Sequence, residues 1–168
     1  QSTNHIFQQA MDYYRRDSAE RVADLTTTSL ELLIEQARLD GPIEVDEASN
    51  VIQSFDKLLS QQNLQRNVDE IFLLVMSGNR ILALSDGDDL FNLYLGGGVD
   101  TTFTNDASTR SALAYFMSNK QALLNQEQIT SSLEGDNTFH VLVPFYDRGE
   151  IAGATYMRVT PDVAGFLE

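Results

Sequence analysis

The chain has 168 residues, a net charge of −14 and no cysteine. Its apolar content of 42% and charged content of 21% predict a single folded domain with a real core rather than a disordered chain. The negative charge disfavours binding to nucleic acid or anionic lipid, and the absence of cysteine excludes disulfides, zinc-thiolate sites and cysteine catalysis.

The first predicted element is one long amphipathic helix over residues 6–38. Its apolar residues recur at three- and four-residue steps, and no Gly or Pro interrupts them before Gly41 and Pro42. The stripe consists of Phe7, Met11, Tyr14, Val22, Leu25, Leu32 and Leu33. A helix of this length spans roughly 50 Å, whereas a small domain is only about 30 Å across. We therefore expect the polar N-terminal end to overhang the domain, and either to meet a second copy of itself or to lead to another module.

A second helix is predicted from about residue 46 to residue 62, after which the apolar period shortens. Its apolar face comprises Val51, Ile52, Phe55, Leu58 and Leu59. Two strands follow at 70–76 and 80–85, joined by a turn over 77–79. Residues 91–95, "FNLYL", are a third strand candidate.

The C-terminal half is predicted to contain a helix over 106–125 and a closing hairpin. Asp106 is the expected cap of the helix. The hairpin strands are expected on either side of a loop over 147–150, with Gly149 in the turn. Because hairpins join neighbouring strands, the chain is predicted to be α+β, with helices packed on an antiparallel sheet of about five strands.

The two hairpin strands are apolar at nearly every position, so both faces of the hairpin are expected to be covered. If Tyr146 pairs with Ile151, strict alternation places two sets of side chains on opposite faces. One face would hold Phe139, Val141, Val143, Phe145, Ala152, Ala154, Tyr156 and Arg158 and would suit helix packing. The other would hold His140, Leu142, Pro144, Tyr146, Ile151, Gly153, Thr155 and Met157. The second face adds a few hydrogen-bonding groups to an apolar wall, as a small-molecule pocket requires, but a one-residue difference in the loop would exchange the faces.

Six residues are candidates for ligand binding. They are Tyr94, Arg110, Tyr115, His140, Tyr146 and Thr155. The aromatic residues are equally consistent with ordinary sheet packing, and His140 with a core histidine satisfied by a neighbour. Arg110 draws attention because the chain has only 11 Lys and Arg residues. It is suited to holding a carboxylate ligand, or it pairs with Asp106 one helical turn earlier.

Two motifs and the long helix are shared with a known family. The stretch "IFLLVMSGNRILALSD" at 71–86 is similar to that family's strand-turn-strand, and "VPFYDRGEIAGATYMRVTPD" at 143–162 is similar to its closing hairpin. In these features the chain resembles the Cache or PDC family of extracytoplasmic sensor domains, which have a PAS-like sheet. The resemblance covers nearly the whole chain. It implies a single domain over 1–168, with a signalling and dimerisation helix over 1–40 and a PAS-like core over 68–162.

The resemblance also implies a function. The domain would be the periplasmic signal-input part of an inner-membrane receptor, which could be a histidine kinase, a chemoreceptor or a diguanylate cyclase. It would bind an unknown small molecule, form a homodimer through the N-terminal helix, and meet the membrane only through flanking spans absent from this chain. We expect the chain to be an excised piece of such a protein. The alternative is a ligand-free structural or protein-interaction module of a membrane receptor. The Tyr, Arg, Trp and Asp pattern of amino-acid-binding double modules is not found, so no ligand class is implied.

The sequence contains no catalytic motif. Its two histidines, His5 and His140, are far apart, and neither has the spacing of a metal site. We therefore expect no enzyme activity, no metal and no cofactor. The acidic stretch from Asp86 to Asp89 fits either a solvated turn or a weak divalent-cation site.

Overall fold

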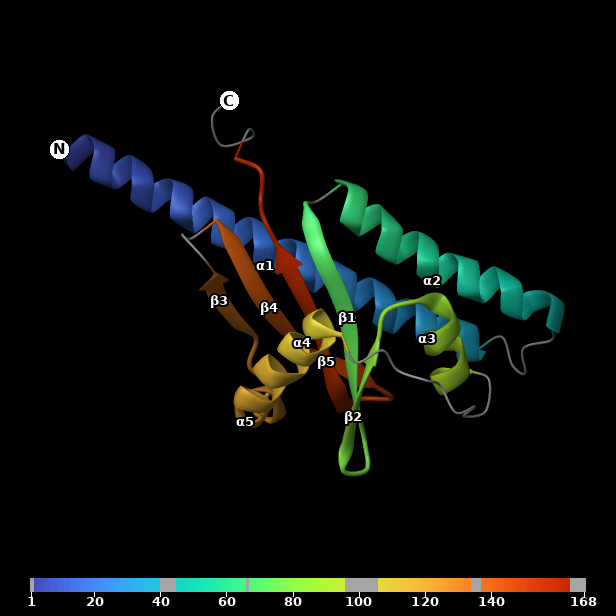
Figure 1. The fold of residues 1–168 in the computed structure, drawn as a ribbon. Coiled ribbons are helices and arrows are strands. Elements are labelled where there is room, and N and C mark those ends of the chain that lie inside the picture. Colours follow the sequence, from blue (N-terminus) through green and yellow to red (C-terminus); the bar gives the residue numbers. More distant parts are fainter. Residues whose placement is uncertain (1, 40–44, 66, 96–105, 134–136, 164–168) are drawn as a thin grey trace.

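The computed structural model describes residues 2–39, 45–65, 67–95, 106–133 and 137–163, and within them a five-stranded antiparallel sheet in the order β2-β1-β5-β4-β3 (Figure 1). The strands are β1 (Val68–Ser77), β2 (Arg80–Leu84), β3 (Ile129–Leu133), β4 (Thr138–Asp147) and β5 (Glu150–Val159). The helices are α1 (Ser2–Leu39), α2 (Val45–Gln65), α3 (Gly87–Tyr94), α4 (Ala107–Ser118) and α5 (Lys120–Leu124). The predicted α+β class, with a long N-terminal helix on a PAS-like antiparallel sheet, is confirmed.

Helix α1 is longer than the sheet on which it packs. It has 38 residues, and Figure 1 shows its N-terminal part extending past the strands. The side chains of residues 3–10 are all exposed, which confirms the overhang expected at this end. No helix within the described ranges has the length and apolar character that a membrane span requires.

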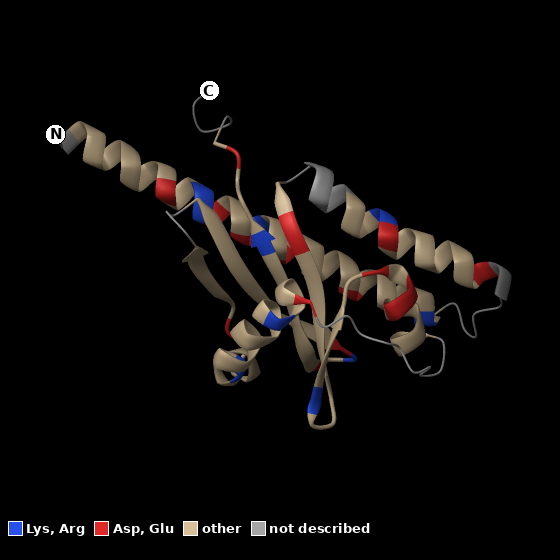
Figure 2. Ribbon diagram, in the orientation of Figure 1, with Lys and Arg blue, Asp and Glu red and all other residues tan. Residues whose placement is uncertain are grey.

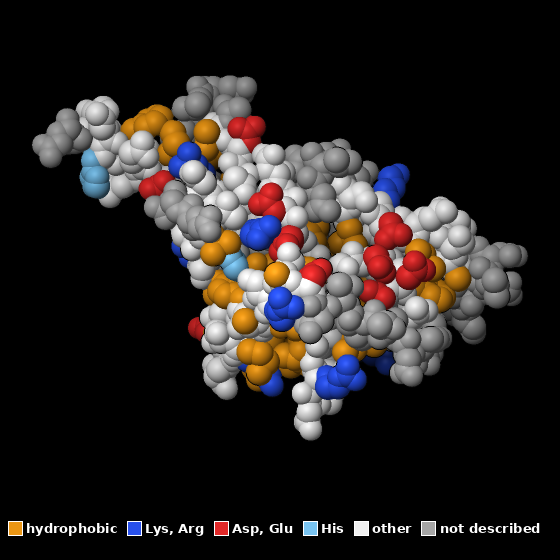
Figure 3. All heavy atoms as spheres, in the orientation of Figure 1, with side chains coloured by type: hydrophobic (Ala, Val, Ile, Leu, Met, Phe, Trp, Pro, Cys, Tyr) orange, Lys and Arg blue, Asp and Glu red, His pale blue; other side chains and the backbone are white. Residues whose placement is uncertain are grey.

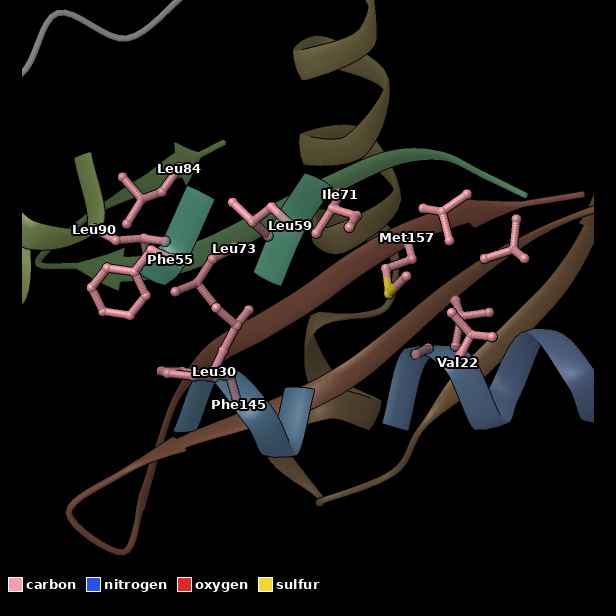
Figure 4. Packing of buried hydrophobic residues seen from close by; sticks show 14 of the residues in the cluster. Val22, Leu30, Phe55, Leu59, Ile71, Leu73, Leu84, Leu90, Phe145 and Met157 are labelled. Atoms are coloured by element: carbon pink, nitrogen blue, oxygen red, sulfur yellow. The ribbon is translucent and has the colours of Figure 1, made fainter. Parts of the chain in front are cut away.

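The larger core lies between the sheet and the layer formed by α1, α2 and α3 (Figure 4). Alternate residues of β1, β4 and β5 point into it, as the pleat of a strand requires. Leu30 of α1, Phe55 of α2 and Phe145 of β4 are fully buried there. The close fit of α3 depends on Gly87, whose backbone N–H donates to Oδ1 of Asp56 at 2.6 Å.

Helices α4 and α5 cover the opposite face of the sheet (Figure 1). Their buried residues Ala112, Phe116 and Leu123 pack on the strands. The strand residues in this smaller cluster are Phe72, Leu74, Leu142, Ala154 and Tyr156. The sheet is therefore covered on both faces.

The prediction of a strand over 91–95 is wrong, because this segment belongs to α3. The carboxylate of Asp86 accepts a hydrogen bond from the backbone N–H of Asp89 at 2.9 Å and caps the helix. Asp88 and Asp89 occupy the first turn, where negative charge is favourable. Aromatic and leucine content resembles that of a strand, but the cap upstream decides the structure.

Strand β3 was not predicted from the sequence, and the predicted helix over 106–125 is divided in two. Residues 129–133, "ITSSL", pair with β4 at the edge of the sheet, where polar residues are common. The helix begins with the expected cap, since Oδ1 of Asp106 accepts from the backbone N–H of Thr109 at 2.8 Å. Asn119 then ends α4 and precedes α5.

The predicted faces of the hairpin are wrong for β5. Tyr146 does pair with Ile151, but the register shifts between Phe145 and Tyr146, so that Phe145 pairs with Gly153. The shift exchanges every later residue of β5 between the faces. Thr155 therefore lies on the α1 face, and Tyr156 lies on the α4 face together with His140.

Candidate functional site

Three aromatic side chains meet under α4 and form the most polar part of the interior. The hydroxyl of Tyr156 and Nδ1 of His140 lie 2.8 Å apart in a buried hydrogen bond. The ring of Tyr115, from α4, is edge-on to the imidazole with centroids 4.7 Å apart. The Tyr115 hydroxyl in turn lies 2.6 Å from Oγ of Ser131 on β3. We call Tyr115, Ser131, His140 and Tyr156 the aromatic cluster.

The imidazole of His140 is held neutral by its surroundings. Its side chain is 8% exposed, and burial is the main cause of a lowered pKa. Arg158 lowers the pKa further, whereas Glu70 raises it. With Tyr156 as donor to Nδ1, the imidazole proton lies on Nε2, which has no hydrogen-bond partner among the described residues.

The two tyrosine hydroxyls of the cluster are also kept protonated. Burial raises the pKa of Tyr156, and nearby Glu70 raises it further. Burial likewise raises the pKa of Tyr115, although its bond to Ser131 opposes the shift. His140 thus contacts a weakly acidic phenol rather than a Ser or Cys nucleophile, an arrangement suited to hydrogen bonding and not to covalent catalysis.

An open hollow of about 550 Å³ adjoins the cluster at one end of the sheet. It is lined by Asp69, Leu133, Asn137, Thr138 and Arg158. We call it the β3–β4 hollow. Arg158 connects it to the aromatic cluster, because Arg158 pairs with His140 in the strand register. Nη2 of Arg158 lies 3.6 Å from Oε1 of Glu70, so the guanidinium is only loosely paired.

The opposite charge in the hollow is fixed in place by hydroxyl groups. Thr160 donates from Oγ1 to Oδ2 of Asp69 at 2.8 Å, and the hydroxyls of Thr138 and Thr160 lie 2.9 Å apart. The hollow thus presents a carboxylate and a guanidinium from neighbouring strands.

The structure brings together only two of the six predicted binding residues, Tyr115 and His140. Thr155 is fully buried in the α1-side core, and its hydroxyl has no partner among the described residues. Arg110 is exposed on α4, outside the aromatic cluster. The pKa of Asp106 is lowered mainly by hydrogen bonds from Thr109, and Arg110 lowers it further.

The remaining two candidates, Tyr94 and Tyr146, lie near the tip of the β4–β5 hairpin. Tyr94 packs on Phe145 with ring centroids 6.2 Å apart, and the guanidinium of Arg38 lies 5.3 Å from its ring centroid. Burial is the main cause of a raised Tyr94 pKa, and its hydroxyl has no partner among the described residues. The backbone N–H of Tyr146 donates to Oε2 of Glu31 at 2.7 Å.

Sequence reasoning missed Asp69, Ser131 and Arg158 as members of a site. Ser131 lies in the strand that was not predicted. Arg158 was placed on the wrong face because the bulge is not visible in the alternation. Asp69 follows the buried Val68 in β1, where the pairing with β5 has an irregular register. No sequence pattern indicated this irregularity.

The acidic segment at the start of α3 contributes a charged surface. Figures 2 and 3 show acidic side chains gathered over α3 and the adjacent part of α2. The Asp89 pKa is raised by burial and by the neighbouring Asp86 and Asp88. No group of three or more potential metal ligands occurs in the part of the chain that the structure describes.

No protein-family model matches the chain, and no curated protein matches it. Among solved structures, it is similar to the sensory domain of the Campylobacter jejuni chemoreceptor Tlp3 (CcmL) with isoleucine bound, with a TM-score of 0.41, 10% identity, and coverage of 95% of this chain and 60% of that one. A further structure of that sensory domain gives a TM-score of 0.40, 11% identity, and coverage of 95% of this chain and 61% of that one. The ligand-binding domain of Tlp3 in complex with L-valine gives a TM-score of 0.40, 10% identity, and coverage of 95% of this chain and 60% of that one. The chain thus spans about 60% of the length of these structures. Two of these structures are sensory domains of a chemoreceptor, and the third is its ligand-binding domain.

Proposed function

We propose that residues 1–168 form a signal-input domain of a bacterial membrane receptor, located on the periplasmic side of the inner membrane. In this proposal the PAS-like core over 68–162 binds a small molecule, and the helix over 1–40 passes the signal on. The output, whether kinase, chemotaxis or cyclase, depends on parts of the receptor outside this chain. No enzyme activity is proposed for the domain.

One observation carries the proposal: the same two strands serve both faces of the sheet. On β4, His140 of the aromatic cluster lies between Phe139 and Val141, which pack in the α1-side core. On β5, Tyr156 lies next to Met157 in the same way. A ligand that moves the cluster must therefore shift residues in contact with the α1 layer. A signal results if the ligand binds one arrangement better than the other.

The β3–β4 hollow is the proposed ligand site, and Arg158, which pairs with His140 in the strand register, links it to the aromatic cluster. Asp69 would receive a cationic group, and Arg158 would receive an anionic group. The most suitable ligand is therefore a small molecule that carries both charges. The unpartnered Nε2–H of His140 is one more donor near Arg158.

A thermal-shift screen with zwitterionic α-amino acids, and with the corresponding amines and carboxylic acids, tests this site. A ligand of the folded state raises the melting temperature as its concentration exceeds its Kd. Arg158→Met should abolish the shift given by a zwitterion, whereas Arg80→Met, at the exposed start of β2, should leave it unchanged. If no probe stabilises the chain, the domain is the ligand-free structural module.

We further propose that the chain forms a homodimer through α1. Leu25, Leu32 and Leu39 lie seven residues apart on α1, and they are 49%, 59% and 79% exposed. Large apolar residues at this spacing on an outer helix face form the seam of a coiled coil. Sedimentation of the wild type against Leu25→Asp tests the dimer, and a strictly monomeric wild type at high concentration would contradict it.

A further inference from the structure

A second cavity lies on the opposite side of the sheet from the β3–β4 hollow. It has a volume of about 570 Å³, within the usual range for small-molecule sites, and is formed by the C-terminal third of α1 and the tip of the β4–β5 hairpin. We call it the hairpin groove. Figure 4 shows the α1 segment around Leu30 beside the Phe145 end of β4, where the groove begins.

The two walls of the groove are held together by charged contacts. Arg38 forms a two-pronged ion pair with Asp147, in which Nη2 lies 3.2 Å from Oδ2. Glu31 accepts the backbone N–H of Tyr146 at 2.7 Å. A site whose walls are fixed in advance loses less conformational entropy when a ligand binds.

The lining of the groove combines apolar side chains with two carboxylates that have no ion-pair partner among the described residues. Ile34 and Phe145 form buried apolar surface, and Leu32 and Leu39 are exposed at the lip. Thr28, Glu31, Glu35, Arg38, Tyr146, Asp147, Arg148 and Gly149 complete it. This apolar surface with a few polar groups is the usual composition of a small-molecule site.

The charges of the groove are not balanced. Arg38 is already neutralised by Asp147, and Arg148 is exposed at the hairpin turn. Glu31 and Glu35 are one helical turn apart on the same wall, where like charges repel. Neither has an ion-pair partner within 4.0 Å in the described ranges of the chain. Burial raises the Glu31 pKa, and the hydrogen bond from the Tyr146 backbone N–H opposes this shift.

We propose that the hairpin groove is a second ligand site, which binds an organic cation with an apolar body. In the monomer, the ammonium group lies between Glu31 and Glu35, and the apolar body covers the exposed side chains of Leu32 and Leu39. The proposed dimer would cover the same two leucines, so the occupant and the dimer exclude each other. This site does not depend on the β3–β4 hollow. Because one wall is α1 itself, an occupant contacts the long helix directly.

The test uses 2-phenylethylammonium chloride as the probe, with 2-phenylethanol as a neutral analogue of similar size. Calorimetric titration is made at protein concentrations where sedimentation shows a single species. The cation is expected to bind about tenfold tighter than the alcohol, because hydrogen bonds to charged groups contribute more than neutral ones. Glu31→Gln and Glu35→Gln should each weaken the cation by about tenfold and leave the alcohol unchanged. Glu127→Gln, an exposed carboxylate outside the groove, is the matched control.

Any of three affinity results would overturn the proposal. They are equal affinity for the cation and the alcohol, full affinity in both glutamine variants, and no measurable binding of the cation to the wild type. Glu35 is exposed, so its variant is expected to fold and keeps the test decisive. A cation that acts only by dissociating a dimer would assign the groove to a second copy of the chain and would also overturn it. A negative result for the hairpin groove would not contradict the proposed site in the β3–β4 hollow, because that site is tested separately by Arg158→Met.

Discussion

Among the described residues, 18 buried apolar residues form one cluster on the sheet face that carries α1. The cluster on the face under α4 has 8 such residues and adjoins the buried hydrogen bond between His140 and Tyr156. Burial of apolar surface is the main favourable term in folding, so the first face supplies most of the stability. The second face has less apolar packing and contains polar groups with specific geometry. The difference suggests that one face fixes the fold and the other can respond to a ligand.

The largest expected effect comes from Gly153, where the backbone of β1 leaves no room for a side chain. A Cβ at this position would lie 1.8 Å from the carbonyl oxygen of Leu74 on β1. Gly153→Ala should therefore lower the free energy of unfolding by about 4 kcal/mol or more, as measured by urea denaturation. Gly78→Ala is the control, since Gly78 has open space and only its φ of +61° is unfavourable for Ala. It should cost about 1 kcal/mol, and equal effects at both positions would contradict the close approach of β5 to β1.

The second prediction compares one substitution on the two faces. Leu30 and Leu123 are 0% and 1% exposed, on α1 and α5 respectively. Leu30→Ala should cost about 4 kcal/mol, because a cavity between the long helix and the sheet has little freedom to collapse. Leu123→Ala should cost about 2 kcal/mol, because a five-residue helix can move into the space. Denaturant midpoints of the two variants give the comparison, and a larger loss at Leu123 would reverse the roles assigned to the faces.

The parts of the fold that the sequence predicted are those with a strong period or a strong cap. The apolar stripe of α1 and the apolar run of β1 identify their elements without tertiary information. Asp106 predicted the start of α4 for the same local reason. The strand prediction for residues 91–95 was wrong because it followed their aromatic and leucine content. The helix is set by the cap at Asp86, which lies five residues upstream.

The candidate site was less predictable because it depends on pairing between strands. Tyr115 and His140 were named individually, but their partners Tyr156 and Ser131 follow from the bulge and from an edge strand. A bulge adds one residue to a strand and leaves the hydrophobic pattern almost unchanged when both faces are covered. Thr155, on β5, was therefore assigned to the wrong face, whereas the alternation within β4 was predicted correctly.

The third prediction concerns the ion pair that holds the hairpin to α1. Both side chains of the Arg38–Asp147 pair are 21% exposed, and Arg38→Met leaves the carboxylate without its partner. This substitution should lower the free energy of unfolding, measured by urea denaturation, by about 1–2 kcal/mol. Arg21→Met removes an exposed pair with Asp17 on the same helix and should cost less than about 0.5 kcal/mol. Equal losses would mean that the hairpin is held by apolar packing alone.

The smallest effect is the pH dependence that His140 contributes on the α4 face. The pKa of His140 is lowered from 6.5 in the folded chain, mainly by burial. Below about pH 6.5 the unfolded chain therefore binds more protons than the folded one, so this residue makes the free energy of unfolding fall as the pH falls. The stabilisation is fully present above that pH and is lost progressively as the pH falls towards the folded-state pKa. His140→Asn retains an acceptor for the Tyr156 hydroxyl but does not titrate, so its loss of stability between pH 7 and about pH 5 should be smaller than that of the wild type. Parallel stability curves for the two proteins would show that the imidazole is not desolvated under α4, and the aromatic cluster would then be more open than its geometry indicates.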